Sequence, residues 1–63
     1  MNVRELVKAL QQLPDQDATV VIGEGTIPDL WLIVGGLVER RISIREDNPD
    51  SAGPGLDRGI EIV

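Results

Sequence analysis

The stretch LVKALQQLPDQDATVVI, residues 6–22, decides the fold. Apolar residues recur at helical spacing as far as Leu13, and Pro14 must end the helix because proline is not tolerated in a helix interior. The following TVVI is β-branched and apolar, which is typical of a strand. Because both of its faces are almost wholly apolar, we expect this strand to lie in the centre of a sheet.

The helix has a clear start signal. Asn2 and Glu5 have the spacing of an N-cap residue and its capping-box acid. A helix is therefore predicted from residue 3 to about Leu13. One apolar stripe runs along it, formed by Val3, Leu6, Val7, Leu10 and Leu13.

Residues 30–45, LWLIVGGLVERRISIR, allow two interpretations. Gly35 and Gly36 are either the turn of a hairpin or a bend in one long strand. The long strand is favoured, because Ile42 and Ile44 alternate with polar residues. Arg40 falls on the apolar side of this alternation, which indicates a bulge nearby.

Residues 46–58 are acidic and rich in proline and glycine, and are predicted to form a mobile loop. Residues 59–63 then close the chain as a short strand. The predicted fold is α+β, a single domain of residues 1–63 in the order α-β-β-β. One N-terminal helix packs on a small antiparallel sheet of about three strands.

Composition narrows the class of protein. A chain of 63 residues without cysteine or histidine buries little surface and has neither disulfides nor a zinc site to stabilise it, so we expect a homo-oligomer. The net charge of −5 argues against binding a nucleic-acid polymer. No signal peptide or membrane-length apolar run is present, so a cytoplasmic location without membrane binding is expected.

Catalytic chemistry is poorly represented, since His, Cys and Tyr are absent, so neither an enzyme nor a cofactor or metal is expected. The candidate ligand-binding residues are four arginines and the single aromatic residue. Arginine suits bidentate contacts with phosphate, and tryptophan suits stacking on a base. The alternatives are salt bridges to nearby acids and apolar packing of the tryptophan. The candidates are Arg40, Arg41, Arg45, Arg58 and Trp31, and the acids are Glu39, Glu46, Asp57 and Glu61.

An amphipathic helix that runs into LP, then acids, then A-x-V-V-I resembles a class of small phage and prophage accessory proteins. The matching residues are Val3, Leu6, Leu10, Leu13, Pro14, Asp17, Ala18, Val20, Val21 and Ile22. The resemblance covers about the first third of the chain. It implies a viral or prophage context, hence the host cytoplasm, and a compact β-sheet fold. It implies no catalytic residues.

Two functions are therefore expected as alternatives. In the first, a homo-oligomer binds and sequesters a small anionic ligand. The ligand class we favour is a phosphorylated nucleotide that acts as a signal in host immunity. The chain is similar in type to phage counter-defence sponges, which act in this way. In the second, the acidic turn and loop, or the apolar residues 30–34, bind a host defence protein directly and inhibit it.

Overall fold

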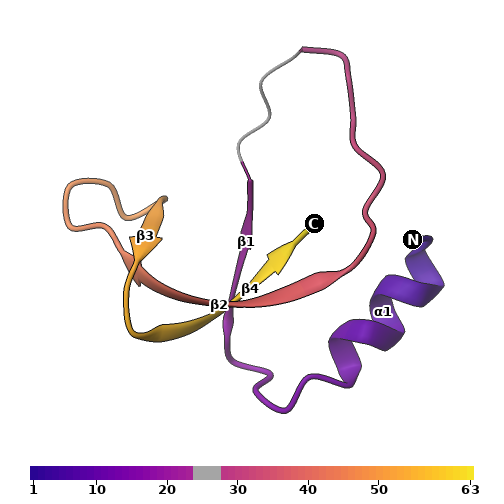
Figure 1. Ribbon diagram of the computed structural model, residues 1–63, viewed down its shortest axis with the longest axis horizontal. Coiled ribbons are helices and arrows are strands. Elements are labelled where there is room, and N and C mark those ends of the chain that lie inside the picture. The colour runs from indigo at the N-terminus through magenta and orange to yellow at the C-terminus, as the bar shows by residue number, and fades with distance from the viewer. Residues whose placement is uncertain (24–27) are drawn as a thin grey trace.

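The computed structural model describes residues 1–23 and 28–63, and Figure 1 shows one helix beside a small curled sheet. The sequence Gly23-Glu24-Gly25, whose glycines are expected to end the strand, lies largely outside the described part of the chain. The elements in chain order are α1 (Val3–Gln11), β1 (Thr19–Ile22), β2 (Leu37–Ile44), β3 (Ala52–Pro54) and β4 (Asp57–Ile62).

The sheet has four strands in the order β1-β4-β2-β3. β1 pairs with β4 in parallel, whereas β2 pairs with β4 and β3 in antiparallel fashion. The α+β class is confirmed, but the prediction of about three antiparallel strands is wrong, because the described sheet is mixed and has four. β1 lies at an edge of the sheet, and the C-terminal strand β4 takes the central position expected for β1.

Neither interpretation of residues 30–45 is correct. Only β2 is a strand, and residues 30–36 form neither a hairpin arm nor a continuation of β2. The register of β2 with β4 runs unbroken from Leu37 to Ile42, so no bulge is needed to place Arg40. The backbone N–H groups of Gly35 and Gly36 both donate to the carbonyl of Val63, which prolongs the pairing.

Residues 46–58 contain more regular structure than a loop. The side chain of Asn48 accepts a hydrogen bond from the backbone of Asp50, and Ser51 donates to the carbonyl of Asn48. This turn reverses the chain, so that β3 pairs with the end of β2. The predicted loop therefore includes all of β3 and the first residues of β4.

The capping box of α1 is present as predicted. The Asn2 side chain accepts from the Glu5 N–H at 2.8 Å, and Glu5 accepts from the Asn2 N–H at 3.0 Å. At the other end, the Gln16 side chain donates to the carbonyls of Leu10 and Leu13. The Leu10 carbonyl also accepts from the Leu13 N–H, so Gln16 adds a second bond there and gives the Leu13 carbonyl, just beyond α1, a partner.

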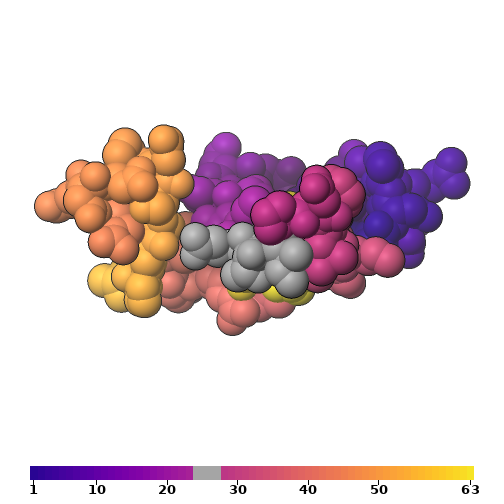
Figure 2. Space-filling view, turned by 90° about the horizontal axis from the view of Figure 1, so that it is seen from above, coloured from indigo at the N-terminus to yellow at the C-terminus, as the bar shows by residue number. Residues whose placement is uncertain are grey.

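The helix covers the sheet only in part. No residue of α1 is buried and Val3 remains 80% exposed, although Leu6 and Leu10 are half-buried. In Figures 1 and 2 the helix lies at one end of the molecule, and β3 lies at the opposite end. Among the described residues, Leu13, just beyond α1, lies beside Ile60.

The buried core is very small. Ile42 and Ile60 are the only buried hydrophobic residues in the described part of the chain, and their register places them on opposite faces of the sheet. Each is used below to name its face, the Ile42 face and the Ile60 face. Gly59 lies beneath the Ile42 side chain, and its missing side chain gives that isoleucine room.

The molecule is flat and has an excess of accessible surface. Its extents are 34 × 34 × 14 Å and its radius of gyration is 12.8 Å, where a compact chain of this length has about 10.6 Å. Its accessible surface is 5520 Å². A typical folded monomer of 6.8 kDa exposes about 1,600 Å² less.

Candidate functional site

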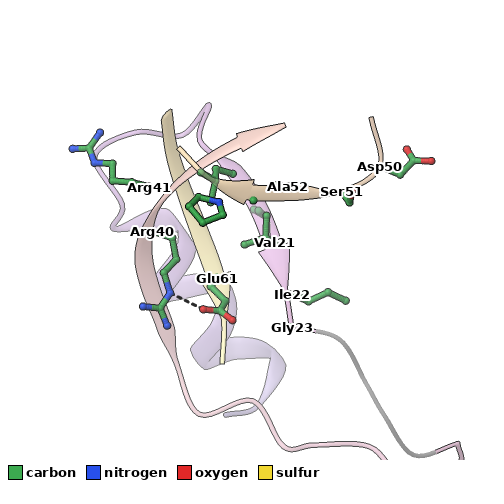
Figure 3. Close-up of a pocket in the computed structure, with 13 residues that line it drawn as sticks. Val21, Ile22, Gly23, Arg40, Arg41, Asp50, Ser51, Ala52 and Glu61 are labelled. Atoms are coloured by element: carbon green, nitrogen blue, oxygen red, sulfur yellow. Dashed lines mark hydrogen bonds and ion pairs between the residues drawn. The ribbon is translucent and has the colours of Figure 1, made fainter. Parts of the chain in front are cut away.

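The curl of the sheet forms an open groove of about 890 Å³ on the Ile42 face (Figure 3). Val21 of β1 and Ala52 of β3 stand on its two sides. Arg40 and Glu61 lie on its floor, joined by a hydrogen-bonded ion pair of 2.7 Å between Nε and Oε1. This short distance is typical of a charge-assisted bond, so the groove contains a satisfied cation.

Arg41 and Arg58 lie together on the other face, the Ile60 face. They are directly opposite one another in the β2–β4 register. Like charges in this position repel each other. Glu39 lies on the same face, with Oε1 4.0 Å from Arg41 Nη2 and 3.8 Å from Arg58 Nε. One carboxylate therefore serves two guanidinium groups, at distances longer than those of a strong ionic hydrogen bond.

The surroundings of this arginine pair are exposed and partly apolar. The side chains of Arg41 and Arg58 are 58% and 51% exposed. Arg41 also approaches the carbonyl of Leu56, with 3.4 Å between nitrogen and oxygen. Leu56 is itself 91% exposed, so the residue whose carbonyl Arg41 approaches carries a solvent-exposed apolar side chain.

Arg45 lies apart from these groups, beyond the end of β2. It forms two hydrogen bonds to the Asp47 carboxylate, of 3.0 and 3.1 Å. The bonds from Arg45 lower the pKa of Asp47 below its ordinary value, an effect that slight desolvation opposes. Arg45 is therefore matched with a single exposed acid.

Trp31 has no packing role within the described chain. It is 82% exposed and belongs to residues 30–33, which carry no secondary structure. The structure therefore brings together only two of the five candidate residues, Arg41 and Arg58. Figure 3 shows Arg41 extending away from the Arg40–Glu61 pair.

Some of the acids that the sequence suggested as arginine partners form these ion pairs, and others do not. Glu39 and Glu61 are partners of arginine, as the salt-bridge interpretation expected, whereas Arg45 pairs with Asp47 instead of Glu46. The alternation of a strand indicates that Glu39 and Arg41 share a face. Nothing in the sequence indicates that Arg58 joins them, because that contact depends on the register of β4 with β2.

No protein-family model, curated protein or solved structure matches this chain. Within residues 1–23 and 28–63, no helix is both long and apolar enough to cross a membrane. The arginine pair and the exposed apolar surface are therefore the features from which a function is inferred.

Proposed function

We propose that the protein is a non-enzymatic, self-associating binding protein that sequesters a small anionic ligand at Arg41 and Arg58. The observation that carries the proposal is the position of these two guanidinium groups. They oppose each other across two strands, are half exposed, and share one loosely held carboxylate. A phosphate bound between them relieves their repulsion and accepts bidentate hydrogen bonds from both.

A phosphorylated nucleotide is the favoured ligand class. The exposed Leu56 beside Arg41 offers apolar surface to a base or sugar, while the arginines hold the phosphate. With the resemblance to phage accessory proteins, this supports a role as a sponge for a nucleotide immune signal in a host cytoplasm. The excess of accessible surface supports the self-association.

Calorimetric titration with inorganic pyrophosphate and with cyclic di-AMP tests the proposal. The double variant Arg41→Gln/Arg58→Gln is expected to lose at least about tenfold in affinity, because hydrogen bonds to charged groups contribute about 1.5–3 kcal/mol each. Arg4→Gln/Lys8→Gln removes the same charge from α1 and is expected to bind as the native protein does. Equal binding by both double variants, or no binding of either probe, would contradict the proposal.

The alternative is an inhibitor that presents its acids to a basic host protein. It is favoured by the exposure of Glu46 and Asp50 on the turn before β3. Protection of phage in cells with a nucleotide-signalling defence separates the two functions. Sequestration predicts that the Arg41/Arg58 variant loses protection and that Glu46→Gln/Asp50→Asn retains it. Inhibition through the acids predicts the reverse.

A further inference from the structure

Residues 30–33, called here the LWLI segment, carry four exposed apolar side chains in succession. Leu30, Trp31, Leu32 and Ile33 are 60%, 82%, 89% and 88% exposed. No backbone hydrogen bond joins these residues to the rest of the described chain. The segment therefore leaves both apolar side chains and backbone donors and acceptors available to a partner.

The two edge strands of the sheet, β1 and β3, differ in how well they are protected from pairing with a further strand. β3 is three residues long and contains glycine and Pro54, features that protect an edge from pairing with another strand. β1 is four residues long and has neither proline nor charge. Its Val20 and Ile22 are 51% and 74% exposed. Among the described residues β1 pairs only with β4, so its other edge is apolar and open to a further strand.

We infer that two copies of the chain associate by placing the LWLI segment of each copy beside β1 of the other. This inference builds on the self-association proposed above and names its interface. The segment and β1 are both four residues long, and an added strand presents alternate side chains to each face of the sheet. Its backbone groups then pair with the free edge of β1.

The segment reaches a second copy more readily than its own β1. The bonds of Gly35 and Gly36 with Val63 hold its C-terminal end at the start of β2. β4 separates β2 from β1 in the sheet. Figure 1 shows the chain leaving this point on the side of the molecule away from β1.

The size of the surface favours a second copy over an unrelated partner. An excess of about 1,600 Å² on each copy corresponds to about 3,200 Å² in a dimer, which falls in the range of obligate homodimers. A reciprocal exchange covers the segment and the β1 edge on both copies at once and closes the symmetry. A foreign strand on β1 would leave the LWLI segment exposed.

Trp31 makes the interface directly observable. It is the only tryptophan, and tyrosine is absent, so the intrinsic fluorescence of the protein reports the surroundings of this one residue. Sedimentation velocity of the native protein over a range of concentrations gives the dimer fraction in parallel. Dilution is expected to shift the Trp31 emission to the red in step with the loss of dimer.

Two variants disrupt the two sides of the contact while retaining Trp31. Leu32→Lys changes the segment, and Val20→Lys/Ile22→Lys changes the edge. Each is expected to raise the dimer dissociation constant by at least about tenfold, because a lysine charge must enter an apolar contact. Val3→Lys/Ile44→Lys adds the same two charges as the edge variant at exposed apolar positions elsewhere and is expected to dimerise normally.

Mixing the two disrupted variants provides the decisive result. A mixed dimer has one intact contact, between the segment of the edge variant and β1 of the segment variant, so mixing is expected to restore part of the dimer. A dimer that persists in the edge variant with unchanged Trp31 emission overturns the inference and leaves self-association standing. A native protein that is monomeric at every concentration overturns both.

Discussion

The substitution Gly59→Ala tests whether Ile42 covers this part of the sheet. A Cβ atom at residue 59 would lie 2.7 Å from Ile42 Cδ1 and 2.9 Å from Ile42 Cγ1. Carbon atoms in favourable contact are about 3.5–4.0 Å apart. Ile42 must therefore move by roughly 1 Å, although it is one of the two buried residues of the core.

Two opposing effects determine how much Gly59→Ala changes the free energy of unfolding. Overpacking a core typically costs about 1–3 kcal/mol, whereas replacing glycine by alanine stabilises by about 0.4–1 kcal/mol through the unfolded chain. Gly59→Ala is therefore expected to lower the free energy of unfolding by roughly 0.5–2 kcal/mol. Gly53 in β3 is the matched control, because a Cβ there meets nothing within 4 Å. Gly53→Ala is expected to be neutral or stabilising.

Urea unfolding followed by far-UV circular dichroism measures both variants. Protein concentration must be held constant, because the proposed self-association would make stability concentration-dependent. Adding Ile42→Val to Gly59→Ala removes the nearest clashing atom and is expected to recover part of the loss caused by the alanine. If Gly59→Ala is as stable as Gly53→Ala, Ile42 does not pack tightly over residue 59.

Two further predictions concern the ends of elements. Asn2→Ala removes the side-chain acceptor at the start of α1 and is expected to cost about 0.5–2 kcal/mol, measured as lost helical circular dichroism and a lower urea midpoint; an unchanged helix content would refute it. The depressed pKa of Asp47 means that its pairing with Arg45 stabilises the fold above pH 3.8 and ceases to do so as pH falls through the lowered pKa. Carboxyl ¹³C titration is expected to show this lowered pKa, and Arg45→Gln to restore the ordinary value; a native Asp47 that titrates normally would contradict the assignment.

Local signals in the sequence predicted the local structure well. The spacing of Asn2 and Glu5 located the start of α1, and the β-branched run TVVI located β1. Pro14 limited the helix, although it ends two residues earlier than expected, at Gln11. Each of these features depends on residues within a few positions of one another, so the sequence pattern is enough to predict it.

The arrangement of the sheet could not be read in this way. β1 pairs with β4, about 40 residues further along the chain, in a parallel register that no turn specifies. Apolar residues on both faces of β1 suggested a central strand, yet β1 is an edge strand. Residues 30–34 were predicted to belong to a strand, but they carry no secondary structure, and residues 30–33 are exposed.

The candidate site was predicted in composition but not in geometry. Its arginines were identified from their residue type, and two of their acid partners from their proximity in sequence. The register of β2 with β4 determines which arginines share a face of the sheet. It brings Arg58 beside Arg41 on the Ile60 face and leaves Arg40 with Glu61 on the Ile42 face. A one-residue change in the pairing of β2 with β4 would have exchanged these neighbours.

Ligand binding and self-association place separate demands on this small fold. The binding protein predicted from the sequence is a homo-oligomer, but β2 and β4 already place Arg41 and Arg58 opposite each other in one chain. A second copy is therefore not required to assemble the proposed anion site. What one chain lacks is cover for its apolar surface, namely the LWLI segment and the β1 edge. The proposed self-association would thus complete the fold, while the arginine pair would remain exposed on the Ile60 face for the proposed ligand.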